Sequence, residues 1–326
     1  MAEPILKVSG LRTHFHTDEG VVKAVDGVDF EVPRGGILGI VGESGCGKSI
    51  TALSIMRLVA EPQGRIVDGQ ILFNGQDLLK LDAQAMRRIR GNRIALILQD
   101  PMTSLNPVFT VGDQIMEAIM LHQGLGRFNA RKRAIEMLER VGIPSAGTRI
   151  DDYPHQFSGG MRQRVVIAMA LSCEPDLLIA DEPTTALDVT IQAQILDLMR
   201  DIRDRNNAAV IMITHDLGVV AELCDKVAVM YAGKVVEYTD VYTIFANPRH
   251  PYTQGLLQSI PQLGGLQARL TPIDGQPPSL SKLPPGCAFA PRCPHAWVKC
   301  HEAPRLDNVE AQHLVRCWLT KEKELR

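Results

Sequence analysis

The stretch Gly42-Glu43-Ser44-Gly45-Cys46-Gly47-Lys48-Ser49 fits the pattern G-x-x-x-x-G-K-S. It follows an apolar run at 37–41 and precedes an expected helix at 50–58. Glycines in such a loop let backbone N–H groups surround the phosphates of a nucleotide, and the helix N-terminus favours an anion. The lysine adds positive charge, and the serine hydroxyl can ligate Mg²⁺. A plain glycine-rich turn is the alternative. We expect nucleotide binding by Gly42, Glu43, Ser44, Gly45, Cys46, Gly47, Lys48, Ser49 and Ile50.

Further short apolar runs predict an α/β fold. They lie at 94–98, 177–180, 210–214 and 227–230. Nearly continuous hydrophobicity over four or five residues is typical of strands buried on both faces, as in a parallel sheet. The longer mixed segments, such as 113–122 and 130–140, favour helices. Residues up to 32 alternate as antiparallel strands do. We therefore expect a parallel core sheet, an antiparallel β subdomain and a helical subdomain.

Composition narrows the class of protein. The 326 residues carry a net charge of −2, which gives no overall field for nucleic acid or an anionic membrane. No apolar run approaches the roughly 20 residues that span a bilayer. The first residues, 1–8, include an acid and no long apolar stretch, which does not fit a signal peptide. We expect a cytosolic chain, in which structural disulfides are disfavoured.

Polar residues follow three of the predicted strands. Asp181 and Glu182 come directly after the run at 177–180, Gln99 follows 94–98, and His215 follows 210–214. Parallel α/β sheets bind ligands at these carboxyl ends. We expect Glu182, His215 and Gln99 to be catalytic: Glu182 polarises the attacking water, and His215 contacts the γ-phosphate. The expected Mg²⁺ ligands are Ser49, Gln99 and Asp181. Helix caps or turns are the alternative roles for Gln99 and His215.

A second glycine-rich helix start is found at Phe157-Ser158-Gly159-Gly160-Met161. Ser158 is a typical helix N-cap, and the two glycines permit close approach of another group. Capped helix starts of this kind bind anions. Because one phosphate site is already supplied, we expect Ser158, Gly159 and Gly160 to serve the nucleotide of a second copy.

Together these motifs resemble those of the ATP-binding subunits of ABC transporters, over nearly the whole chain. Residues 157–161 are similar to the family signature Leu-Ser-Gly-Gly-Gln, with Phe157 and Met161 as departures. The resemblance implies a P-loop ABC ATPase fold and a head-to-tail dimer holding two ATP molecules. It also implies that Asp188, in a sequence similar to the D-loop, crosses the dimer interface. Finally, it implies an aromatic side chain stacked on adenine, with Phe15 as our candidate and His16 nearly as good.

Other stretches are similar to the ATPases of dipeptide and oligopeptide importers, above all 99–107 and 248–253. This resemblance implies a subunit that hydrolyses ATP to power peptide import through two separate transmembrane permease subunits. A second homologous ATPase subunit, making a heterodimer, and indirectly an extracytoplasmic peptide-binding protein are further expected partners; no nucleic acid is expected. The expected place is the cytoplasmic face of the inner membrane, as a peripheral protein. In that family, the segment after Gln99 receives a membrane subunit's coupling helix, through Met102, Leu105, Pro107 and Phe109.

Two other functions remain open from the sequence. One is a soluble ABC ATPase of DNA repair or translation, although such proteins usually carry coiled-coil insertions or two cassettes in one chain. The other is an importer ATPase for nickel or glutathione, because those systems share much of this cassette. We predict a nucleotide-binding domain at 1–245, with its helical signature subdomain at about 100–172, and a C-terminal extension at 246–326.

The extension is rich in proline and cysteine. It holds eleven of the 20 prolines and four of the seven cysteines: Cys287, Cys293, Cys300 and Cys317. Four thiols in a segment with little core suggest a staple, which from the residues alone can be zinc or an iron–sulfur cluster, whereas disulfides are disfavoured. The importer resemblance implies a [4Fe–4S] cluster, with zinc as the alternative. His295, His301 and His313 lie nearby and could replace a ligand.

Overall fold

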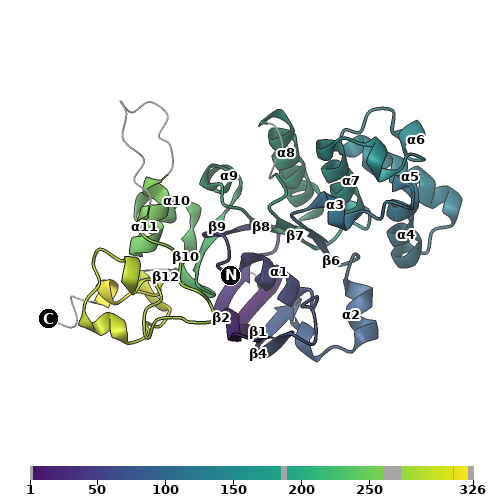
Figure 1. Ribbon diagram of the computed structural model, residues 1–326. Coiled ribbons are helices and arrows are strands. Elements are labelled where there is room, and N and C mark those ends of the chain that lie inside the picture. Colours follow the sequence, from purple (N-terminus) through teal and green to yellow (C-terminus); the bar gives the residue numbers. More distant parts are fainter. Residues whose placement is uncertain (1–2, 185–188, 260–272, 311, 322–326) are drawn as a thin grey trace. The chain divides into compact units, whose positions relative to one another are not determined.

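The computed structural model describes residues 3–184, 189–259, 273–310 and 312–321 (Figure 1). The chain forms two compact units that alternate along the sequence. One, the phosphate-loop unit, comprises 4–32, 37–79 and 213–326. The other, the helical unit, comprises 1–3, 33–36 and 80–212. This is a different division from the one predicted at residue 245, which stays a prediction.

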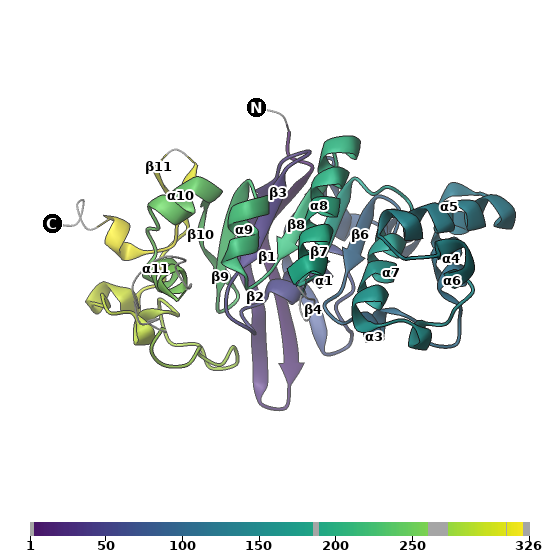
Figure 2. The same ribbon diagram turned by 90° about the horizontal axis from the view of Figure 1, so that it is seen from above.

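An antiparallel sheet in the phosphate-loop unit has the strand order β2-β1-β4-β5. Strands β1 and β2 make a long hairpin, with Leu6 opposite Val32 at one end and Thr17 opposite Gly20 at the turn (Figure 2). Leu6 and Val8 bury alternate side chains, as expected for period 2, and a register shift before the buried Leu11 moves the pattern by one residue. The strands are β1 (Leu6–Thr17), β2 (Gly20–Val32), β4 (Gly64–Phe73) and β5 (Gln76–Asp77).

A second set of strands in this unit runs in the order β11-β12-β10-β9-β3. β3 and β9 are parallel, and all five residues of β3 are buried, as predicted from its apolar run. The two strands from the C-terminal extension, β11 and β12, were not expected, because each is too short to carry an alternating pattern. The strands are β3 (Ile37–Val41), β9 (Lys226–Tyr231), β10 (Lys234–Asp240), β11 (Asp307–Glu310) and β12 (His313–Val315).

Four α-helices complete the described part of this unit, together with short 3₁₀ turns. Three of the helices begin at a side-chain cap, from Asp216, Asp240 and His250. The helices are α1 (Lys48–Ile55), α9 (Leu217–Leu223), α10 (Val241–Ala246) and α11 (Pro251–Gln258). The 3₁₀ turns are Leu78–Lys80, Ala290–Arg292, Val298–His301 and Trp318–Lys321.

The helical unit places α-helices beside strands in the order β8-β7-β6, of which β6 and β7 are parallel. Helices α4 to α7 gather into one group (Figure 1), with Ile115, Ile119, Ala134 and Leu138 fully buried. The elements are β6 (Ile94–Ile97), β7 (Leu177–Asp181), β8 (Ala209–Ile213), α2 (Ala83–Ile89), α3 (Pro101–Ser104), α4 (Val111–Gln123), α5 (Arg127–Arg140), α6 (Ala146–Arg149), the 3₁₀ turn Pro154–Gln156, α7 (Gly159–Leu171) and α8 (Val189–Asn206).

The helices predicted at 113–122 and 130–140 are confirmed as α4 and α5. Helix α4 starts at Thr110, whose side chain accepts the Asp113 N–H, and it ends at Gly124 with φ = +66°. Both ends therefore follow the usual capping preferences. No helix among the described residues combines the length and apolar content needed to cross a bilayer.

Candidate nucleotide site

The phosphate loop between β3 and α1 requires glycine at two places where the backbone leaves no room. Gly42 has φ = +153° and Gly47 has φ = +108°, conformations that other residues rarely adopt. A Cβ on Gly42 would stand 2.2 Å from the carbonyl oxygen of Met230, and one on Gly47 would stand 2.3 Å from that of Ala24. The loop is therefore pressed against β9 and β2, which fix its path.

Lys48 lies beneath this loop and is only 6% exposed. Its Nζ donates to the carbonyl oxygens of Gly42 at 2.8 Å and Glu43 at 3.1 Å. Burial raises the pKa of the neighbouring Cys46 thiol. Ser44 and Gly45 form an exposed rim. A solvent-open glycine rim above a buried ammonium group fits the phosphates of a nucleotide.

The acidic end of β7 lies in the helical unit. Asp181, the last residue of β7, is buried, and Glu182 follows it with φ = +48°. The side-chain amide of Gln99 donates to Glu182 Oε2 at 3.0 Å. The structure thus brings two of the three predicted catalytic side chains into contact. This carboxylate and amide oxygen set has the chemistry to hold Mg²⁺ and orient water.

The predicted signature forms the start of α7. Ser158 caps this helix and accepts the Met161 N–H at 3.4 Å. Ser158 and Gly159 are exposed, and a Cβ on Gly159 would meet no atom within 4 Å. The open space above this helix start can admit a ligand.

Two internal contacts of this region were not anticipated. Phe157, the departure from the usual leucine, is buried with the Arg149 guanidinium 5.6 Å from its ring centre, so it serves packing. Gln163 on α7 donates to the carbonyl oxygen of Pro183 at 3.0 Å. It therefore ties the signature helix to the turn that carries Glu182.

The remaining predicted site residues have different outcomes. His215 is exposed just after β8, and the preceding Thr214 N–H donates to the Ile40 carbonyl oxygen at 3.2 Å, beside the strand that leads into the phosphate loop. Phe15 is half-buried on β1, and a Cβ on Gly64 would stand 2.6 Å from its ring, whereas His16 is exposed. Asp188 lies outside the described residues.

The four cysteines of the extension carry donor atoms that suit a metal. All seven cysteines of the chain are free. Burial raises the pKa of Cys317 to about 12 and also raises the pKa of Cys287 and Cys293. The Cys287 N–H donates to the Cys300 carbonyl oxygen at 2.9 Å, so these two residues are neighbours in the fold.

Their arrangement nevertheless does not fit a ready cluster or zinc site. Nowhere in the described residues do three or more His, Cys, Asp or Glu side chains form a group that could hold a metal ion. Cys293, Cys300 and Cys287 instead line three separate cavities. Of the nearby histidines, His313 is buried with Nε2 2.7 Å from Glu237 Oε1, so it is already engaged.

Comparison with known proteins assigns the family. A model described as ABC transporter matches residues 25–185, and one described as oligopeptide/dipeptide transporter, C-terminal region, matches 236–300. The chain is 54% identical over 322 residues to the dipeptide transport ATP-binding protein DppD of Bacillus subtilis, covering 98% of this chain and 96% of the relative. The chain belongs to the ATP-binding proteins of the ABC transporter family. This ABC ATPase is also 50% identical to the oligopeptide transport ATP-binding protein OppD of Haemophilus influenzae, over 98% of both chains.

Solved structures support the same assignment. The dimeric post-hydrolysis ATP-binding cassette MJ0796, bound to ADP and Pi, has a TM-score of 0.66 and 25% identity to the present ABC ATPase. It covers 72% of this chain and 98% of its own. CbiO1 from Clostridium perfringens, part of the transporter complex cbiONQ, has a TM-score of 0.62, with coverages of 76% and 92%. The protein is an ATP-hydrolysing enzyme with the predicted α/β ABC fold.

Two contacts to the phosphate loop were missed from the sequence. Tyr252, in the segment singled out for its family resemblance, and Arg292, in the extension, both bind Glu43. No local pattern marks Arg292, which lies 249 residues from its partner.

Proposed function

We propose that this chain is the ATP-hydrolysing subunit of a peptide importer. The observation that carries the proposal is the similarity to peptide-transport ATPases over nearly the full length, including the C-terminal region at 236–300. Importers for nickel or glutathione are the finer alternatives. Transport assays in membrane vesicles with labelled dipeptides, nickel or glutathione separate these solutes.

In this proposal, each predicted site residue has one role in hydrolysis. The phosphate loop with Lys48 binds the β- and γ-phosphates. Ser49, Gln99 and Asp181 would hold Mg²⁺, and the ion would supply positive charge beside the phosphates. Glu182, contacted by Gln99, orients or deprotonates the attacking water. His215 contacts the γ-phosphate, and Phe15 stacks on adenine. Ser158, Gly159, Gly160 and Asp188 act on the nucleotide or interface of a second copy.

Glu182→Gln tests the central role. Removing the base while keeping the side chain's shape should lower kcat by about 10²–10⁴-fold and leave ATP bound. Glu174→Gln is a matched control, because Glu174 also has a positive φ, +53°, but pairs with Arg133 on the surface. Near-normal hydrolysis by the Glu182 variant, measured as phosphate release, would refute the catalytic assignment.

The proposed partners follow from the same family. Two transmembrane permease subunits provide the channel, a second homologous ATPase completes a heterodimer, and an extracytoplasmic peptide-binding protein delivers the peptide. The chain then sits as a peripheral protein on the cytoplasmic face of the inner membrane. Co-purification with detergent-solubilised permeases tests this against the alternative, an ABC ATPase of DNA repair or translation, which would instead co-purify with nucleic acid or ribosomes.

The permease contact is proposed at the segment after Gln99. Met102, Val108 and Phe109 are each more than half exposed there. The side chain of Gln114 holds the backbone beneath them, accepting the Asn106 N–H at 2.8 Å and donating to the Phe109 carbonyl oxygen at 3.1 Å. The sequence interpretation also placed Leu105 in this contact, but Leu105 is buried and packs inside the helical unit.

The last part of the proposal is a [4Fe–4S] cluster on Cys287, Cys293, Cys300 and Cys317, with zinc as the alternative. The backbone hydrogen bond from the Cys287 N–H to the Cys300 carbonyl oxygen, at 2.9 Å, supports it because it brings two of the four cysteines together. Because the four thiols are not gathered as a ligand set, metal binding would require them to move together, and no step of hydrolysis is assigned to the cluster. Iron and sulfide quantitation on anaerobically purified protein decides the point, since a colourless, zinc-loaded preparation would exclude the cluster.

A further inference from the structure

Glu43, the second residue of the phosphate loop, is held from three sides. Its N–H donates to Tyr252 Oη at 2.9 Å, and its carbonyl oxygen accepts from Lys48 Nζ at 3.1 Å. Its carboxylate accepts from both ends of the Arg292 guanidinium, at 2.7 Å from Nη1 and 3.0 Å from Nη2. Two of the three contacts thus come from residues beyond position 250.

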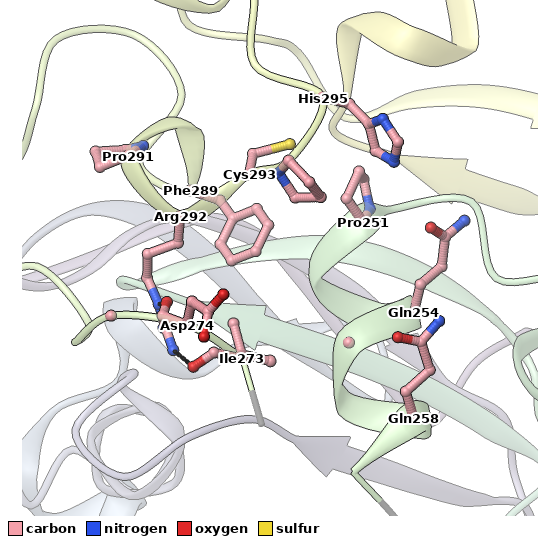
Figure 3. A pocket seen from close by; sticks show the side chains of 13 residues that line it. Pro251, Gln254, Gln258, Ile273, Asp274, Phe289, Pro291, Arg292, Cys293 and His295 are labelled. Atoms are coloured by element: carbon pink, nitrogen blue, oxygen red, sulfur yellow. Dashed lines mark hydrogen bonds between the residues drawn. The ribbon is translucent and has the colours of Figure 1, made fainter. Parts of the chain in front are cut away.

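Arg292 uses all five of its N–H groups. Besides the two on Glu43, Nε donates to the Asp274 carbonyl oxygen at 2.9 Å, Nη2 to that of Ile273 at 3.3 Å, and Nη1 to Tyr231 Oη at 3.4 Å. Figure 3 shows its side chain directed toward the Ile273–Asp274 segment, away from Cys293. The side chain is only 5% exposed. A lysine has three donors on a single nitrogen and cannot reproduce this fork.

Tyr252 is placed as firmly as Arg292. The ring is fully buried against Tyr231 and Phe289, with ring centres 4.6 and 5.4 Å away. His250 begins α11 by accepting the Tyr252 N–H at 3.0 Å, which fixes the tyrosine's backbone. The segment 248–253 was singled out only by its family resemblance. Its role in the structure is to place the Tyr252 hydroxyl where it accepts the Glu43 N–H of the phosphate loop.

We infer that Arg292 and Tyr252 are positioning residues for nucleotide binding. A carboxylate in a loop that binds phosphates repels them, and the bidentate Arg292 neutralises that charge where it stands. Tyr252 holds the backbone of the same residue, so the loop keeps its path. The inference rests on nucleotide binding by the ATPase and is independent of the transported solute.

Arg292→Ala should weaken nucleotide binding on the order of tenfold, because a charged hydrogen-bonded pair is lost and the Glu43 charge is exposed to the phosphates. The loss should fall on KM for ATP more than on kcat, as for an interaction present in both ground and transition states. Fluorescence titration of the full-length protein with N-methylanthraniloyl-ADP and Mg²⁺ measures the affinity, and steady-state hydrolysis gives the split.

Glu43→Gln supplies the decisive readout. In the Arg292→Ala background it should restore most of the lost affinity, since it removes the charge that Arg292 neutralised. Alone it should tighten nucleotide binding, because the positive charge of Arg292 is then unopposed. Tyr252→Phe should cost severalfold in affinity through one neutral hydrogen bond. A merely structural role for Arg292 predicts no rescue.

Arg316→Ala is the matched control. Arg316 is another largely buried arginine of the extension, with Nε donating to the Val235 carbonyl oxygen at 2.8 Å, and none of its hydrogen bonds reaches the phosphate loop. It should lower thermal stability without changing affinity for the fluorescent nucleotide. The inference is overturned if Arg292→Ala binds the nucleotide as wild type does, if Arg316→Ala weakens binding equally, or if Glu43→Gln fails to rescue.

Discussion

At the scale of single residues, His250 shows how burial can fix a protonation state. Its imidazole is buried, and Nδ1 accepts the Tyr252 N–H. Burial lowers the pKa of His250 to about 3, and the nearby charge of Arg316 also lowers it. The ring is therefore neutral in the folded protein throughout the physiological range, as its role as an acceptor at the start of α11 requires.

This buried histidine makes stability depend on pH. In the unfolded chain its pKa is about 6.5, so below that pH the unfolded state binds a proton that the folded state refuses. The free energy of unfolding should therefore fall by about 2–3 kcal/mol from this residue alone between pH 7 and pH 4.5. Urea unfolding of wild type and His250→Asn measures it, because asparagine can cap the helix without titrating. Parallel pH profiles for the two proteins would contradict the assignment.

At the scale of elements, the pairing of β10 with β12 contains a buried carboxylate. Glu237 on β10 is fully buried, and it accepts the N–H groups of Arg249 at 2.7 Å and His250 at 2.9 Å. His313 on β12 completes the set at 2.7 Å. One side chain thus joins β10, the start of α11 and β12.

Glu237→Ala should lower the free energy of unfolding by about 3–5 kcal/mol, because it leaves a buried imidazole and two backbone N–H groups without their hydrogen-bond partner. Glu310, on the neighbouring strand β11, makes an exposed ion pair with Arg249. Glu310→Ala breaks this pair and should cost at most about 1 kcal/mol. Urea midpoints of the two variants make the comparison. Equal losses would mean that the buried set contributes no more than a surface pair.

Which elements could be predicted from the sequence depended on how local their signals are. The apolar run of β3, the glycines after it and the Ser158 cap of α7 are each readable within a few residues. Strands β11 and β12 are three or four residues long and owe their existence to the edge of β10. The contact between Glu43 and Arg292 joins distant parts of the chain, so no periodicity or motif could reveal it.

At the scale of the whole molecule, the proposed importer function requires that hydrolysis be communicated to a membrane partner. We expect Phe109→Ser to reduce permease co-purification and peptide-stimulated ATP hydrolysis, because it removes an exposed apolar side chain from the proposed permease contact. Phe128→Ser on α5 is the control, as Phe128 is also exposed in the helical unit but lies outside that segment. Equal behaviour of the two variants in reconstituted vesicles would place the permease elsewhere.

The pairing of β10 with β12 has a consequence for synthesis on the ribosome. Strand β10 ends at Asp240 and β12 begins at His313, about seventy residues later. Because synthesis proceeds at about 5–20 residues per second, the edge of β10 stays unpaired for roughly 4–15 s before β12 is made. An unpaired edge invites other nascent chains, and an acidic side chain within it opposes such pairing. Glu237 therefore disfavours pairing of this edge with other chains until His313 has been synthesised, and it then forms a hydrogen bond with His313.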